Sequence, residues 1–364
     1  MSVCKRAYEY LSMREVSSAT PWLGNLRDNG NISSCFIIQP DDSLISIYDN
    51  LKNAALISQA GGGLGVSLSR LRAKGSDLMG VQGIAGGVLG WNKLFNDTAV
   101  SVNQRGKRAG AFTIALPIWH ADIEDFLDCQ TEAGDLRKKS FDIQPQVGIH
   151  DIFMRLKDSF GNEWHTFCPH EVESKLGIKI YECYGAQFED YYSRCVAAYK
   201  AGLLKVCHVH DAKKLFIRIM EVAFETGLPY LAFIDTINEA NPNKHEGFIP
   251  CVNLCTESFS NVVPDKYFHT CNLMSLVVGR ISMDRLEEVA AFTLRMLDNG
   301  IDLTNPPLKE SGAHNNRYRT VGIGIQGLHD LVAREHGNFL DEKFMTEIAE
   351  RIQYGAVMES IDLA

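Results

Sequence analysis

Residues 35–59 read CFIIQPDDSLISIYDNLKNAALISQ and join a predicted strand to a predicted helix. The apolar run at 35–38 is typical of a buried strand. Asp42 and Ser43 predict the start of a helix, and the glycines at 61–63 predict its end. Between them, apolar residues recur at helical spacing: Leu44, Ile47, Leu51, Ala54 and Ile57. A strand followed by an amphipathic helix is the repeating unit of α/β folds.

The same alternation continues along the chain. Further buried strands are predicted at 112–116 and 230–234, and helices at 88–102, 186–202, 211–226, 284–299 and 341–361. The pattern predicts an α/β sheet or barrel with helices outside. A dinucleotide-binding fold is not supported, because the glycine run at 61–66 lacks the last glycine of G-x-G-x-x-G and follows a predicted helix, where that motif requires a strand.

Composition excludes several classes of protein. The chain has 364 residues, of which 45% are hydrophobic, so it can bury a large core in one or two domains. A net charge of −9 argues against long nucleic acid as a partner. The sequence contains neither a membrane-length apolar run nor a signal peptide, which predicts a cytoplasmic protein. Ten cysteines are too few for a disulfide scaffold and are expected to be thiols in the cytoplasm.

The segment C-V-N-L-C-T-E at 251–257 is the strongest candidate for a reactive site. Asn253, Cys255 and Glu257 alternate with other residues, so in an extended segment their side chains share one face. A thiol between an amide and a carboxylate can take part in proton transfer and in binding a substrate hydroxyl. A strand with an exposed polar face would show the same alternation, so spacing alone leaves both interpretations open.

An ordered set of motifs resembles the large subunit of class I ribonucleotide reductase, in its central portion. N-L-C-x-E at 253–257 is preceded by S-S-C-F at 33–36 and followed by C-N-L-x-S-L from Cys271. Five shorter matches complete the set: D-S-L at 42–44, L-R-A-x-G-S at 71–76, P-I-W-H at 117–120, G-I-G-I-Q-G at 322–327 and I-D-L-A at 361–364. The resemblance therefore covers essentially the whole chain.

The resemblance implies an α/β fold that is part of a ten-stranded barrel built from two five-stranded halves. Residues 16–248 would form the first half with the effector site and dimer helices, 249–258 a finger loop, and 259–364 the start of the second half. Residues 1–364 would thus be one incomplete catalytic domain. We expect it to lack the family's N-terminal regulatory nucleotide-binding module and its C-terminal part, through either truncation or natural splitting, and to be inactive alone.

The resemblance also implies catalytic roles. Cys255 would carry a transient thiyl radical that abstracts the 3′ hydrogen of a ribonucleotide. Cys35 and Cys271 would supply the reducing equivalents and end as a disulfide. Glu257 would accept the 3′ hydroxyl proton, and Asn253 would bind the sugar. The expected substrate-binding residues are Thr20, Ser34, Asn253 and Glu257.

A second expected site binds a nucleotide effector, either a deoxynucleoside triphosphate or ATP. Asp42, Ser43, Leu44 and Arg72 match the family's effector-binding motifs, and a helix start beside an arginine suits a polyphosphate. An ordinary helix cap beside a solvated arginine is the alternative. Gln104 and Arg108, in the loop 104–110, would pass information from effector to substrate.

Expected partners also follow from the family. They are a ribonucleoside diphosphate, a metal-containing small subunit that generates the radical, a thioredoxin or glutaredoxin type reductant, a second copy through the helices 43–59 and 88–102, and a complementing C-terminal fragment. No metal or cofactor is expected on this chain, and Cys207, His208 and His210 lack a second ligand cluster. The alternatives are a class II, adenosylcobalamin-dependent reductase, whose finger usually reads N-P-C-G-E, and a noncatalytic nucleotide-binding remnant.

Overall fold

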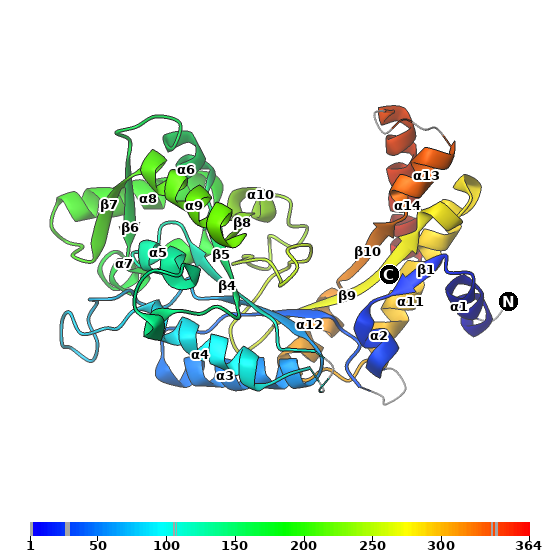
Figure 1. Ribbon diagram of the computed structural model, residues 1–364, viewed down its shortest axis with the longest axis horizontal. Helices are drawn as coiled ribbons and strands as arrows, with labels where there is room; N and C mark the ends of the chain where they lie inside the picture. Colours follow the sequence, from blue (N-terminus) through cyan, green and yellow to red (C-terminus); the bar gives the residue numbers. More distant parts are fainter. Residues whose placement is uncertain (1–2, 26–29, 105, 107, 336–337, 339–340) are drawn as a thin grey trace. The chain divides into compact units, whose positions relative to one another are not determined.

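The computed structural model describes residues 3–25, 30–104, 106, 108–335, 338 and 341–364 (Figure 1). The chain divides into two compact units. The larger is continuous, Cys35–His269, and the smaller combines Met1–Ser34 with Thr270–Ala364.

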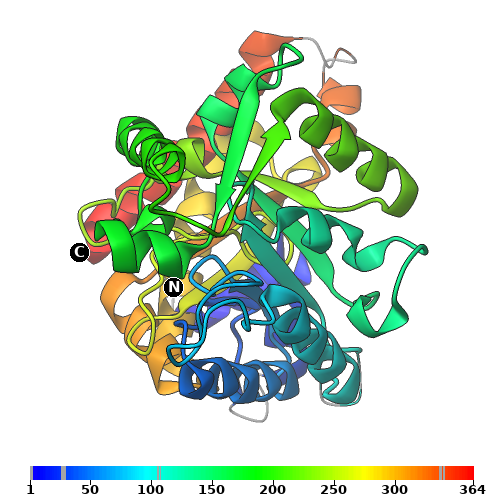
Figure 2. The ribbon, with the colours of Figure 1, turned by 90° about the vertical axis from the view of Figure 1, so that its left-hand side faces the viewer.

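The larger unit is built on a sheet of five parallel strands that curls into a half-barrel (Figure 2). In spatial order the strands are β2 (Cys35–Ile38), β3 (Gly63–Ser67), β4 (Phe112–Pro117), β5 (Gln144–Ile149) and β8 (Tyr230–Phe233). The predicted α/β class and the first five-stranded half of the barrel are therefore confirmed.

Helices cover this sheet and complete the unit. α3 (Leu44–Gln59) and α4 (Val88–Ser101) pack side by side (Figure 1). The other helices are α5 (Ile123–Leu127), α6 (Asp151–Leu156), α7 (Pro169–Leu176), α8 (Gly185–Lys200), α9 (Ala212–Thr226) and α10 (Ile234–Glu239). A separate two-stranded antiparallel sheet consists of β6 (Glu163–Phe167) and β7 (Cys207–Asp211). The four long helices lie within two residues of the predicted bounds.

The strands form a core that is closed on both faces. Every residue of β2, β3 and β4 is buried, which matches the uninterrupted apolar runs of parallel strands. Fully buried side chains such as Phe36 and Phe112 each stabilise the fold by about 1.5–3 kcal/mol relative to exposure.

Strand β3 was not predicted from the sequence. Its residues Gly63 and Gly65 lie in the glycine run that we interpreted only as the end of a helix. Glycine has a low intrinsic strand preference, so an alternating glycine strand gives a weak local signal. The reason for the glycines lies in a distant segment, the finger loop.

The smaller unit has a three-stranded sheet. β9 (His269–Val277) is antiparallel to β1 (Val16–Ser18) and parallel to β10 (Val321–Gln326). Its helices are α1 (Val3–Ser12), α2 (Thr20–Asn25), α11 (Leu286–Leu303), α12 (Lys309–Tyr318), α13 (Leu328–Glu335) and α14 (Glu342–Leu363). α14 packs along α11 closely enough that a Cβ on Gly355 would lie 2.3 Å from the carbonyl oxygen of Glu287. Among the described helices, none combines the length and apolar character that a bilayer crossing requires.

Candidate active site

The segment 251–257 rests directly on the glycine strand β3. A Cβ on Gly65 would lie 2.7 Å from the carbonyl oxygen of Val252, and one on Gly63 would lie 2.6 Å from Cδ2 of Leu254. Real Cβ atoms essentially never approach other atoms this closely. Gly65 therefore makes room for the finger backbone and Gly63 for the Leu254 side chain, which explains why a central strand lacks side chains at these positions.

Two buried polar side chains fix the incoming limb of the finger to the neighbouring strands. The N–H of Val252 donates to Oε1 of Gln146, on β5, over 3.2 Å. Oγ1 of Thr113, on β4, donates to the carbonyl oxygen of Leu254 over 3.3 Å. Gln146 and Thr113 were not predicted from the sequence, because each is a single polar residue within a strand and contacts a residue more than 100 positions away.

The tip of the finger is a tight turn. Oδ1 of Asn253 accepts hydrogen bonds from the backbone N–H groups of Glu257 and Ser258, over 3.1 and 3.0 Å. Thr256 has a positive φ of 64°. The alternation of Asn253, Cys255 and Glu257 therefore does not come from an extended strand, because the asparagine side chain supplies a local acceptor that favours a turn.

The turn nevertheless brings the predicted reactive groups together. Nδ2 of Asn253 donates to Oε1 of Glu257 over 2.9 Å. Sγ of Cys35, Sγ of Cys255 and a carboxylate oxygen of Glu257 all lie within 4.8 Å of one another. Asn253 and Cys35 are buried, whereas Cys255 and Glu257 are exposed. The structure therefore places a solvent-accessible thiol close to both a second thiol and a carboxylate.

The Cys35 side chain changes the acidity of its neighbour. Its hydrogen bond lowers the pKa of the Cys255 thiol below the ordinary value, although burial and the charge of Glu257 act in the opposite direction. A lower pKa increases the fraction of thiolate, the form that reacts with electrophiles and oxidants.

The donor atoms of Cys35, Cys255 and Glu257 are also of the types that bind metal ions. Among the residues that the structure describes, they are the group of three such side chains close enough to share one ion. Cys207, His208 and His210 are not part of such a group in the described chain.

Three further predicted residues belong to the smaller unit. Cys271 is buried on β9, and its carbonyl oxygen accepts the N–H of Ser34 over 2.9 Å. Oγ of Ser34 is buried and has no hydrogen-bond partner among the described atoms. Thr20 is exposed at the first residue of α2. The pairing of Cys271 with Cys35, and the roles of Thr20 and Ser34 toward substrate, stay predictions.

Four of the predicted effector residues cluster at the start of α3. Oγ of Ser43 caps the helix by accepting the N–H of Ser46 over 3.2 Å, and Leu44 is exposed. The Asp42 carboxylate accepts hydrogen bonds from Nε and the backbone N–H of Arg72, over 2.8 and 3.1 Å. Burial raises the pKa of Asp42, against the effect of Arg72. A cation thus lies beside a capped helix start, and the binding of a nucleotide there stays a prediction.

The other two predicted effector residues, Gln104 and Arg108, lie near the opposite end of α3. The N–H of Gln104 donates to the carbonyl oxygen of Arg108 over 2.8 Å, and its Nε2 donates to that of Gly62 over 3.2 Å. Sixteen helical residues separate the two ends by about 24 Å. Gly62 directly precedes Gly63, which contacts Leu254 of the finger. The loop 104–110 therefore contacts the residue just before strand β3, on which the finger rests. Arg105 and Lys107 of this loop lie outside the described residues.

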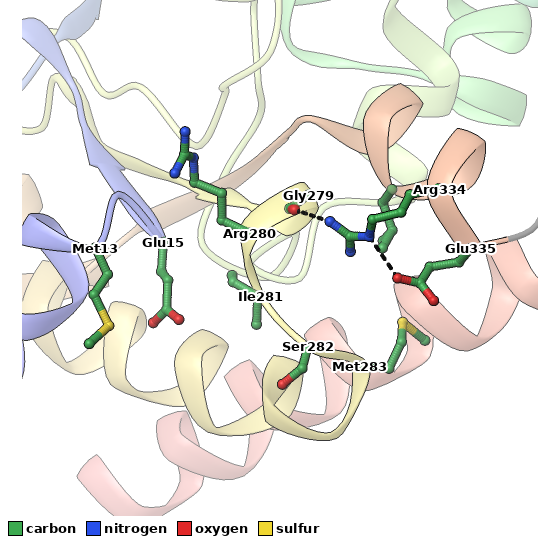
Figure 3. Close-up of a pocket in the computed structure, with 10 residues that line it drawn as sticks. Met13, Glu15, Gly279, Arg280, Ile281, Ser282, Met283, Arg334 and Glu335 are labelled. Carbon is green, nitrogen blue, oxygen red and sulfur yellow. Dashed lines mark hydrogen bonds and ion pairs between the residues drawn. The ribbon is translucent and has the colours of Figure 1, made fainter.

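A cavity in the smaller unit is the alternative location for a site (Figure 3). It has a volume of about 640 Å³ and is lined by residues that include Glu15, Arg280 and Arg334. Arg334 donates to the carbonyl oxygen of Gly279 and to Glu335, and Glu15 forms a two-bond ion pair with Arg285. Most of its charged groups are therefore paired within the protein, and it contains no thiol.

A family model and several similar curated proteins point to the same family. Residues 33–364 match the family model described as ribonucleotide reductase, barrel domain. The alpha subunit of ribonucleoside-diphosphate reductase from Synechocystis is 45% identical over 99% of this chain, which covers 47% of that protein. The alpha subunit from Treponema pallidum is 36% identical over the whole chain and 46% of its own length. The large chain from Neurospora crassa is 34% identical over 98% of this chain and 39% of its own length.

The chain thus spans about half the length, or less, of these curated relatives. The family match covers the half-barrel sheet, the glycine strand and the finger with its convergent thiols. The chain therefore belongs to the ribonucleotide reductase family and contains a portion of its large-subunit barrel domain.

Proposed function

We propose that this chain supplies the radical-bearing part of the catalytic centre of a ribonucleoside-diphosphate reductase. The observation that carries the proposal is the convergence of the Cys35 thiol, the Cys255 thiol and the Glu257 carboxylate within 4.8 Å at the finger tip. A general acid or base must lie within hydrogen-bond reach of the proton it moves, and a carboxylate beside an exposed thiol meets that requirement for a sugar bound at the tip.

The proposed reaction replaces the 2′ hydroxyl of the substrate by hydrogen. The Cys255 sulfur, as a thiyl radical, takes the hydrogen atom from C3′ and becomes a thiol. Glu257 accepts the proton of the 3′ hydroxyl, and the 2′ hydroxyl leaves as water after protonation by a cysteine thiol. Water loss leaves a 3′ ketone with the radical at C2′, and a hydrogen atom from the second thiol of the Cys35–Cys271 pair forms the new C2′–H bond. The disulfide that the two sulfurs then form passes the remaining electron to the ketone, while Glu257 returns its proton to O3′. The hydrogen atom then returns from Cys255 to C3′, which regenerates the radical.

The radical would come from a separate small subunit, and the disulfide would be reduced by a thioredoxin or glutaredoxin type protein. A nucleotide at Asp42, Ser43, Leu44 and Arg72 would select the substrate through Gln104 and Arg108. The hydrogen bond from Gln104 to Gly62, next to the strand under the finger, supports such a connection.

A dimer through α3 and α4 is part of the proposal. Leu44, Ile45 and Tyr48 are 63%, 77% and 54% exposed on α3, and Val100 is 60% exposed on α4. Several exposed apolar side chains on two helices that pack together are characteristic of a surface that a protein partner covers.

Reconstitution tests this function. The full chain would be mixed with a polypeptide carrying the rest of a relative's alpha subunit, with the small subunit, an effector nucleotide and a dithiol reductant. We expect deoxyribonucleoside diphosphate to form with the wild-type chain and not with Cys255→Ala, whereas Cys207→Ser should behave as wild type. Equal product from wild type and Cys255→Ala would refute the proposed role of this thiol.

A further inference from the structure

A buried histidine holds the outgoing limb of the finger. His269 is 1% exposed, and both of its ring nitrogens contact serine hydroxyls. Nε2 lies 2.9 Å from Oγ of Ser258, and Nδ1 lies 2.7 Å from Oγ of Ser260. A hydroxyl both donates and accepts, so the two serines can satisfy either tautomer of a neutral imidazole.

Ser258 in turn is bound to Asn253 through its backbone. Its N–H donates to Oδ1 of Asn253 over 3.0 Å, and its carbonyl oxygen accepts the N–H of Asn253 over 3.1 Å. These two bonds close the turn that contains Cys255. Because Nδ2 of Asn253 also donates to Glu257 over 2.9 Å, hydrogen bonds lead without a break from the His269 ring to the carboxylate.

We propose that His269 is a positioning residue that fixes the finger tip through Ser258. Gln146 and Thr113 hold the incoming limb at Val252 and Leu254, whereas His269 holds the outgoing limb. With one limb released, the turn can rotate about the other, and the Cys255 thiol moves away from Cys35. The inference rests on the proposed function, in which Cys255 and Glu257 must meet one sugar.

The two ring nitrogens make different contacts, and this difference provides a matched pair of variants. A glutamine places its terminal amide near the position of Nε2, which faces Ser258, and an asparagine places its amide near Nδ1, which faces Ser260. If His269 fixes the finger tip through Ser258, His269→Gln should keep the Cys255 thiol close to Cys35, and His269→Asn should not. Ser258→Ala and Ser260→Ala form a second pair, since among these contacts only Ser258 bonds to Asn253.

The measurement is cross-linking of Cys35 to Cys255 in the full chain by dibromobimane, which becomes fluorescent when both ends have alkylated thiols. Peptide mass mapping identifies the linked pair. We expect the yield to fall about tenfold in His269→Phe, His269→Asn and Ser258→Ala. We expect His269→Gln and Ser260→Ala to stay within about twofold of wild type, since the bond to Ser258 remains.

Wild-type yields in His269→Asn and Ser258→Ala would overturn the inference, as would rescue by asparagine instead of glutamine. If His269→Phe fails to fold, the asparagine and glutamine variants decide the question alone. Cross-linking requires no turnover, so it tests the positioning role separately from the proposed function. If the variants show the expected cross-linking yields but the reconstituted enzyme reduces no ribonucleotide, the proposed function is refuted and the positioning role of His269 is still supported.

Discussion

Nδ2 of Asn253 donates a hydrogen bond to Oε1 of Glu257 over 2.9 Å, while Oδ1 of the same side chain accepts two backbone N–H groups. A carboxamide can do both because it carries a donor and an acceptor on one planar group. The residue that stabilises the turn is therefore also the residue that orients the carboxylate.

Asn253→Asp should greatly reduce catalysis while the turn at the finger tip keeps its structure. The new carboxylate can still accept the two backbone bonds, but it replaces a donor to Glu257 by a like charge, which repels the Glu257 carboxylate instead of orienting it. We expect the rate of ribonucleotide reduction to fall by roughly 10²-fold, the lower range for losing a positioned acid or base. Turnover of the reconstituted enzyme measures this effect, and an unchanged melting temperature shows that folding is intact. Wild-type turnover would contradict it.

Gly65→Ala should displace the finger, since its Cβ would lie 2.7 Å from the carbonyl oxygen of Val252. Neither backbone can yield without moving a buried strand. We expect about a tenfold or greater loss of activity and of Cys35–Cys255 cross-linking, because the oriented groups no longer meet. Gly90→Ala is the matched control, because its new Cβ on helix α4 would have no atom within 4 Å from another part of the described chain. That change should be neutral or stabilise the protein by up to about 1 kcal/mol. Similar behaviour of the two variants would contradict the packing argument.

Local patterns predicted the elements whose residues carry their own signal. The helix 44–59 combines a serine cap with apolar residues at helical spacing, and both features depend only on neighbours in sequence. Strand β3 lacks that signal, because its glycines are explained by Val252 and Leu254, nearly 190 residues later. The resemblance of the motifs predicted which residues react, namely Cys35, Asn253, Cys255 and Glu257. It did not predict how their side chains are arranged.

The residues that support the site were missed for the same physical reason. Gln146 and His269 do not belong to the quoted motifs, and each acts through one or two tertiary hydrogen bonds. A single polar residue in a strand has many possible partners until the fold brings one to it. The sequence therefore predicted the reactive groups but not the side chains that hold them.

Cys35→Ala should raise the pKa of the Cys255 thiol. The hydrogen bond from Cys35 is the main cause of the lowered pKa, and its loss leaves burial and the negative Glu257 to favour the neutral thiol. The rate of Cys255 alkylation by iodoacetamide, followed by peptide mass spectrometry as a function of pH, should therefore shift to higher pH. Cys129→Ala is the control, since burial raises the pKa of that thiol to about 12 and it should leave the profile unchanged. A shift to lower pH in Cys35→Ala would contradict this account.

His314 should make the protein sensitive to acid. Burial lowers its pKa from 6.5 to about 3, so the folded chain keeps it neutral while the unfolded chain protonates it below pH 6.5. Stability is therefore unaffected above that pH and is lost as the pH falls from 6.5 toward 3. The loss between pH 7 and 5 amounts to about 2 kcal/mol for this one group. Urea unfolding of wild type and His314→Asn at both pH values measures the difference, and equal pH dependence of the two proteins would exclude His314 as the cause.

Arg72→Gln should weaken binding of a nucleoside triphosphate at the start of α3. Arg72 and Asp42 form an ion pair of 2.8 Å, with side chains 20% and 19% exposed, so the guanidinium lies beside the helix start that would receive the phosphates. Replacing it removes a charge-assisted hydrogen bond, and we expect the dissociation constant to rise about tenfold. Lys52→Gln is a suitable control because it removes a positive charge from the exposed surface of the same helix. Isothermal titration calorimetry with deoxynucleoside triphosphates measures both variants. Equal weakening by the two would indicate a general charge effect, whereas loss in Arg72→Gln alone would place the ligand at the helix start.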